Sequence, residues 1–133
     1  MSQTGAKNLT GTWHGRYSYA GAPEGVAFTA DIIEIAGQIS GGTVETAESR
    51  SAGKTQFTAV LDGRRSLGHV AFTKTYDGSG GWHHRVDYDG VLSLDATEIE
   101  GRWRIRGEMT GRFMMIRPQG RAQSVTKRVA AKV

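Results

Sequence analysis

Apolar and polar positions alternate with a period of two along most of this chain. Between residues 9 and 19, Trp13 and Tyr17 fall on one side of the alternation and His14 and Arg16 on the other. Successive side chains of a β-strand point to opposite faces. The segment is therefore predicted to be a strand with one aromatic face turned toward a core.

The same period recurs in seven further segments, which are separated by short stretches rich in Gly, Asp and Ser. The predicted strands are residues 9–19, 26–35, 39–48, 56–62, 67–76, 82–94, 99–106 and 110–117. Sequential strands at regular spacing with short turns are typical of an antiparallel up-and-down barrel, and a β-sandwich gives similar spacing. We expect an all-β fold, an eight-stranded antiparallel up-and-down β-barrel, with no helix before Pro118.

Charge divides the 133 residues into a body and a tail. Residues 1–116 carry 12 Lys and Arg against 13 Asp and Glu, whereas residues 117–133 carry five basic residues and no acid. We expect a polar lead-in at 1–8, a barrel domain at 9–117 and a basic C-terminal tail at 118–133. The tail is either a short amphipathic helix with Val125, Val129 and Val133 on one side or a frayed terminus. Because it lacks aromatic residues for stacking, nucleic-acid binding is not expected.

The composition excludes several classes of protein. The chain contains no Cys, which rules out disulfides, thiolate nucleophiles and Cys-based zinc sites. No apolar run approaches the roughly 18 residues of a membrane span, and the first residues lack the apolar core of a signal peptide. We expect a cytoplasmic protein without a membrane span.

The 19 glycines suggest how the barrel interior is used. Gly15, Gly90 and Gly101 share the inward face with aromatic residues, and an inward glycine leaves volume that a bulky side chain would fill. This pattern favours non-enzymatic binding of a small, mainly apolar ligand inside the barrel. The predicted ligand-binding residues are Tyr17, Tyr19, Phe28, Phe72, Tyr88, Trp103 and Met115.

A second hypothesis is that the same side chains plug the barrel, which then acts through its outer surface as an interaction module or homo-oligomer. Ile33 and Ile35 fall opposite Phe28, so either a bulge shifts the register or this strand is covered on both sides. Together with Val91, they are the residues expected at such an interface.

Enzymatic activity is a third and less favoured hypothesis. The chain contains no Ser-His-Asp, Gly-x-Ser-x-Gly or phosphate-loop signature. A small-barrel isomerase or hydratase needs only one acid–base residue, for which His84 as general base is the candidate. Tyr88 or Tyr17 would then donate a hydroxyl from deeper in the cavity.

His83 and His84 also raise the question of a metal. Consecutive strand residues point to opposite faces and cannot both bind one ion, so no metal site is predicted. Haem needs only one inward His, and the pattern from Gly11 to Gly15 is similar to the Gly-x-Trp-x-Gly with which a nitric-oxide-handling haem barrel begins. Otherwise no cofactor is expected.

The strand order resembles that of the calycins, the group of small barrels that includes lipocalins and avidins. Their first strand opens with a Gly-x-Trp whose ring plugs one end, and Gly11-Thr12-Trp13 matches it. The similarity to the avidin strands extends over about residues 9–117. Its further matching segments are Gly42-Thr43-Val44-Glu45, Gly68 to Tyr76, Tyr88-Asp89-Gly90, Ile99 to Trp103 and Gly111-Arg112-Phe113.

The resemblance implies a fold but not biotin binding. Gly15, Tyr19, Val44 and Gly111 stand where avidins place polar biotin ligands, and only Thr46 and Trp103 are compatible with that set. In lipocalins an Arg of the last strand covers the first-strand Trp, which is favourable by about 0.5–2 kcal/mol. The candidates for this arginine are Arg112 and Arg117, and the strand order favours Arg112, so the resemblance implies a structural plug of Trp13 and Arg112.

Overall fold

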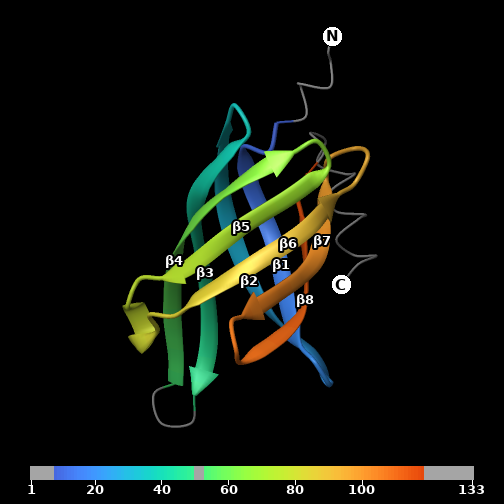
Figure 1. Ribbon diagram of the computed structural model, residues 1–133. Helices are drawn as coiled ribbons and strands as arrows, with labels where there is room; N and C mark the ends of the chain where they lie inside the picture. The colour runs from blue at the N-terminus through green and yellow to red at the C-terminus, as the bar shows by residue number, and fades with distance from the viewer. Residues whose placement is uncertain (1–7, 50–52, 119–133) are drawn as a thin grey trace.

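The computed structural model describes residues 8–49 and 53–118 as one closed barrel of eight antiparallel strands in up-and-down order (Figure 1). Every strand pairs with its sequence neighbours, and β1 also pairs with β8. This closure confirms the barrel and excludes the sandwich. The strands are β1 Gly11–Tyr19, β2 Ala22–Ile35, β3 Gln38–Ser49, β4 Gly53–Ser66, β5 His69–Tyr76, β6 Arg85–Leu92, β7 Glu98–Ile105 and β8 Met109–Ile116.

Several strand boundaries differ from the predicted ones because pairing extends past the hydrophobic alternation. β4 is much longer than the predicted 56–62, since Arg64 and Arg65 still pair with β5. β6 begins at Arg85, because the preceding residues belong to a connection that contains the 3-10 turn η1, Ser79–Gly81. The predicted C-terminal helix lies outside the described residues.

The open question about Ile33 and Ile35 is resolved by the register of β2. Pairing with β3 runs without interruption from Phe28 to Ile35, so no bulge shifts this part of the strand. The side chains of Ile33 and Ile35 are 49% and 70% exposed. Both therefore point to the outside of the barrel and are not covered.

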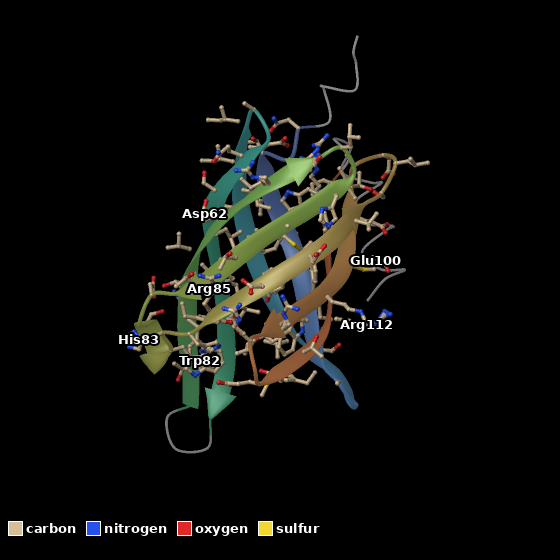
Figure 2. The ribbon with its side chains drawn as sticks, viewed as in Figure 1. Asp62, Trp82, His83, Arg85, Glu100 and Arg112 are labelled. Carbon is tan, nitrogen blue, oxygen red and sulfur yellow. The ribbon has the colours of Figure 1, made fainter. Side chains whose placement is uncertain are left out.

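The barrel interior is a continuous core of side chains from all eight strands. Its two ends differ. At the end where β1 begins, Leu9, Trp13 and Ile99 are completely buried; we call this the Trp13 end. At the other end, where β5 joins β6, Trp82 and Ile105 are only partly buried; we call this the Trp82 end (Figure 2).

Arg117, not Arg112, covers Trp13. The guanidinium carbon of Arg117 lies 4.7 Å from the centroid of the Trp13 ring, and Trp13 Nε1 donates a hydrogen bond to the Leu9 carbonyl at 2.9 Å. The pairing of His14 with Ile116 brings Arg117 level with Trp13. Arg112 lies opposite Ser18, farther along β1, and its side chain is on the outer face (Figure 2).

The inward glycines do not leave space for a ligand. A Cβ at Gly15 would collide with the ring of Phe28, and one at Gly90 would lie 2.9 Å from the ring of Phe113. A Cβ at Gly101 would collide with the backbone of β6. These glycines are needed because neighbouring rings and strands approach closely, so the prediction that they create free volume is wrong.

Within residues 8–49 and 53–118, no helix is long and apolar enough to cross a membrane.

Candidate functional site: a buried polar cluster

A carboxylate, an ammonium group and two phenols meet inside the barrel. Glu45 Oε1 accepts hydrogen bonds from Lys74 Nζ at 3.1 Å and from the Tyr76 hydroxyl at 2.8 Å. Glu45 Oε2 accepts one from the Tyr17 hydroxyl at 2.6 Å. We call these four residues the Glu45 cluster; they come from β1, β3 and β5.

Aromatic rings enclose the ammonium group of Lys74. Its Nζ lies 4.8 Å from the ring centroids of Tyr17 and Phe28, 5.0 Å from that of Tyr76 and 5.4 Å from that of Tyr88. The Lys74 side chain is 1% exposed and that of Glu45 is fully buried. A cation held against desolvated ring faces gains cation–π stabilisation, which offsets part of its lost hydration.

Strand register explains how the cluster is assembled. Lys74 lies on the inner face of β5 between Phe72 and Tyr76, each two residues away. Glu45 pairs with Phe28 of β2 and Phe57 of β4, which places its carboxylate within an aromatic layer. The charged pair is thus surrounded by apolar residues on every neighbouring strand.

Burial shifts the pKa values of the cluster. It lowers the pKa of the Lys74 ammonium from its ordinary value, and the nearby Glu45 carboxylate only partly opposes this shift. Burial, reinforced by Glu45, raises the pKa of Tyr17 and Tyr76 well above the ordinary range of a phenol. Burial also raises the pKa of Tyr88. At neutral pH the phenols of Tyr17 and Tyr76 are therefore hydrogen-bond donors to the Glu45 carboxylate, and Lys74 loses its proton more easily than a surface lysine.

Thr43 adds a hydrogen-bonding group that has no partner. It precedes Glu45 by two residues on the inner face of β3, is 3% exposed, and its Oγ1 makes no hydrogen bond. Its cross-strand neighbours are Ala30 and Ala59, whose methyl groups cannot satisfy it. A buried hydroxyl without a partner costs about 1–3 kcal/mol, so this position suits a ligand that would supply one.

Aromatic side chains line the Trp82 end around the cluster. The Trp82 ring stacks on Phe57 with centroids 4.0 Å apart and meets Tyr76 edge-on at 5.0 Å. On the other side, Trp103 contacts Tyr17 and Tyr19 edge-on. Trp82, in the connection between β5 and β6, lies against Tyr76 at the more exposed end of the barrel (Figure 2).

The structure brings most of the predicted ligand-binding residues together in the interior. Tyr17, Phe28 and Tyr88 surround Lys74, and Phe72 stacks on Tyr88 with centroids 4.8 Å apart. Trp103 is buried and its Nε1 donates to the Ser18 carbonyl. Tyr19 is 39% exposed at the barrel mouth, and Met115 is fully buried beside Ile99, toward the Trp13 end.

His84 is not placed to act as a base with Tyr88. It precedes β6, it is exposed, and its ring packs against those of Tyr76 and Trp82 at 4.7 and 5.4 Å. Tyr88 lies in the interior, four residues farther along. The expected inward orientation of His84 is wrong, because the strand alternation begins only at Arg85. Within residues 8–49 and 53–118, no group of three or more His, Asp or Glu is arranged to hold a metal ion.

The predicted interface residues do not form one patch. Ile33 and Ile35 are on β2 and Val91 is on β6, four strands away around a closed ring of eight. They therefore lie on opposite sides of the barrel. The partners of Ile33 across β3 and β4 are Ser40 and Asp62, so its surroundings are polar.

Sequence reasoning missed the centre of the site. A signal existed for Lys74, because the alternation places it on the same face as Val70, Phe72 and Tyr76. No comparable signal existed for Glu45. Of the adjacent residues Val44 and Glu45, the apolar valine would be expected inside the barrel, yet Val44 is 44% exposed and Glu45 is buried.

Comparisons with known proteins support the architecture. No family model matches the chain, and no curated protein sequence matches it. Among solved structures, the chain is similar to a protein described as the "De novo design of a fluorescence-activating beta barrel". The TM-score is 0.54 and the identity 13%, over 88% of this chain and 100% of that chain. At this identity the similarity shows the fold alone: the chain is a closed, eight-stranded, up-and-down antiparallel β-barrel.

Proposed function

We propose that this protein binds a small, mainly aromatic molecule inside the barrel at the Trp82 end, with the Glu45 cluster as the polar floor of the site. The observation that carries the proposal is the burial of an ion pair and two phenols within an aromatic layer. The ligand's apolar surface would contact the rings, and its polar group would meet the cluster.

Energetics support a role beyond folding. Replacing a buried ion pair by apolar residues of similar volume is often neutral or stabilising by about 1–4 kcal/mol, so stability alone does not favour Glu45 and Lys74. Ionisable groups with shifted pKa values inside a pocket or barrel are more typical of functional sites. The unpartnered Thr43 hydroxyl lies two residues from Glu45 on the inner face of β3, on the side toward the Trp13 end.

The aromatic lining supports the chemical class of the ligand. Flat rings favour offset-stacked or edge-on contacts with other rings, which the residues at the Trp82 end already make with one another. Because these rings now fill the space, binding requires Trp82 to move away from Phe57. The calycin resemblance of β1 and the similarity to a designed barrel described as fluorescence-activating are compatible with binding inside the barrel.

Tryptophan fluorescence tests the proposal directly. We expect a saturable change when para-methoxybenzyl alcohol or a similar aromatic alcohol is added, because Trp82 and Trp103 line the site. Trp82→Phe should remove most of the change, whereas Trp13→Phe, at the opposite end, should keep it if the variant is folded by circular dichroism. Native mass spectrometry of protein purified from its own host should show a bound small molecule. A bare chain together with no response to aromatic probes would overturn the proposal.

A further inference from the structure

Lys74 is an unusual amine in this chain. Of the five lysines, Lys54 is exposed and three lie outside the described residues, whereas Lys74 is almost completely buried. The nucleophilic form of a lysine is the neutral amine, and desolvation favours that form. The burial that lowers the pKa of Lys74 thus also increases its nucleophilic fraction.

The groups around Lys74 can take up and return protons. Glu45 Oε1, 3.1 Å from Nζ, is placed to receive the ammonium proton. Tyr76 and Tyr17 already donate to the two oxygens of that carboxylate, at 2.8 and 2.6 Å. An acid–base pair and two hydroxyl donors therefore lie within one hydrogen-bonded group, as general acid–base catalysis requires.

We propose that the ligand is an aromatic aldehyde or ketone and that Lys74 Nζ binds it covalently as an imine. This inference rests on the proposed function, because the carbonyl compound must occupy the same aromatic layer. The rings of Tyr17, Phe28, Tyr76 and Tyr88 enclose the nitrogen that attacks.

The reaction is a condensation that balances without an oxidant or reductant. Glu45 takes one proton from the Lys74 ammonium, and the lone pair of Nζ forms a bond to the carbonyl carbon. A tyrosine hydroxyl protonates the carbonyl oxygen, and the tyrosinate takes back one of the two protons left on Nζ, giving a neutral carbinolamine. Glu45 returns its proton to the carbinolamine hydroxyl, and water leaves as the C–O bond breaks and the lone pair of Nζ forms the second bond to carbon, so that Nζ keeps its last proton as a protonated imine. The product is a C=N bond, and water hydrolyses it by the reverse path, so the protein acts as a reversible covalent carrier.

Reductive trapping tests the inference. The probe is para-methoxybenzaldehyde, and its non-carbonyl analogue is para-methoxybenzyl alcohol. After incubation with the aldehyde and borohydride, we expect one added reduced probe per chain, mapped by peptide mass spectrometry to Lys74. Lys54→Arg should retain this adduct. The double variant Glu45→Gln with Lys74→Met should lose it while remaining folded by circular dichroism.

Glu45→Gln alone separates a chemical role from a structural one. It should slow trapping of the aldehyde at least tenfold while the alcohol still changes the fluorescence, because the amine loses its proton acceptor but the rings remain. Unchanged trapping would overturn the role of Glu45 in this reaction.

The two probes distinguish failure of this inference from failure of the proposed function. If both change the fluorescence but the adduct is absent or spread over exposed lysines and the N-terminus, imine formation is overturned and binding stands. If neither probe changes the fluorescence and no adduct forms at Lys74, both proposals fail.

Discussion

Lys74 Nζ lies 3.1 Å from Glu45 Oε1 in the barrel interior, and both side chains are shielded from solvent. Breaking a buried pair leaves one charge without compensation, which typically costs about 3–5 kcal/mol. We therefore expect Lys74→Met to lower the free energy of unfolding by about that amount. The double variant Lys74→Met with Glu45→Gln should lie within about 1 kcal/mol of the wild type or above it, because it buries no ion.

Urea unfolding of the wild type, both single variants and the double variant gives the coupling energy between the two residues. If the double variant were destabilised by the sum of the single effects, the ion pair would not be a coupled unit.

The buried phenols predict loss of stability in alkali. Tyr17, Tyr76 and Tyr88 have pKa values raised above about 10 in the folded state, so above that pH the unfolded chain releases phenolic protons that the folded chain keeps. Each such group lowers the stability by at most about 1.4 kcal/mol per pH unit. Lys74 acts in the opposite sense. Because its pKa is lower in the folded state, the free energy of unfolding rises with pH until the pH reaches the pKa of lysine in the unfolded chain, about 10.5.

Because three phenols lower the stability as the pH rises and only one amine raises it, the free energy of unfolding should fall steeply above about pH 10. Urea titrations at about pH 9, 10 and 11 measure the slope. Tyr76→Phe should make the fall shallower by up to about 1.4 kcal/mol per pH unit, since one ionising group is removed. An identical slope in this variant would contradict the assignment of Tyr76 as a buried phenol.

Gly15 should be intolerant of any side chain. Because a Cβ there would collide with the ring of Phe28, Gly15→Ala should destabilise the barrel by about 1–3 kcal/mol through overpacking. Gly68→Ala is the matched control, since its Cβ would lie no closer than 3.9 Å to a neighbouring atom. Thermal unfolding of both variants measures the difference.

Adding Phe28→Leu to Gly15→Ala should recover part of the stability, because the smaller side chain leaves room for the new methyl group. An equal effect of alanine at both glycines would show that Phe28 does not occupy this space.

The sequence predicts the fold well because each strand of a barrel shows a local alternation of apolar and polar residues. Residues such as Trp13, Phe72 and Tyr88 identify the inner face of their strands by period alone. The alternation does not say how deeply a strand continues into its turn. The period of two therefore places the His84 side chain inside the barrel, although β6 begins only at Arg85 and His84 is exposed.

The site is less predictable because it depends on contacts between distant strands. Tyr17, Glu45 and Tyr76 meet through hydrogen bonds that span 28 and 31 residues of sequence. A buried charge also breaks the apolar pattern from which burial is inferred, so Glu45 resembles an outward residue until its partners are known. The glycines mislead for the same reason, since only the packed structure shows that the ring of Phe28 fills the space over Gly15.

Arg117, directly after β8, and Arg112, five residues earlier within β8, allow a direct test of what closes the Trp13 end. Arg117 lies over the Trp13 ring and also donates hydrogen bonds to the carbonyl groups of Ala96 and Thr10, at 3.0 and 3.3 Å. Arg117→Gln should therefore lower the free energy of unfolding by about 1–2 kcal/mol, through the lost cation–π contact and these hydrogen bonds. Arg112→Gln, on the exposed outer face, should change it by less than about 0.5 kcal/mol. Urea unfolding measures both effects, and in Arg117→Gln acrylamide should quench the Trp13 fluorescence more strongly because the ring loses its cover. If Arg112→Gln were the more destabilising change, the sequence-based assignment of the plug would be restored and the contact between Arg117 and Trp13 would not stabilise the fold.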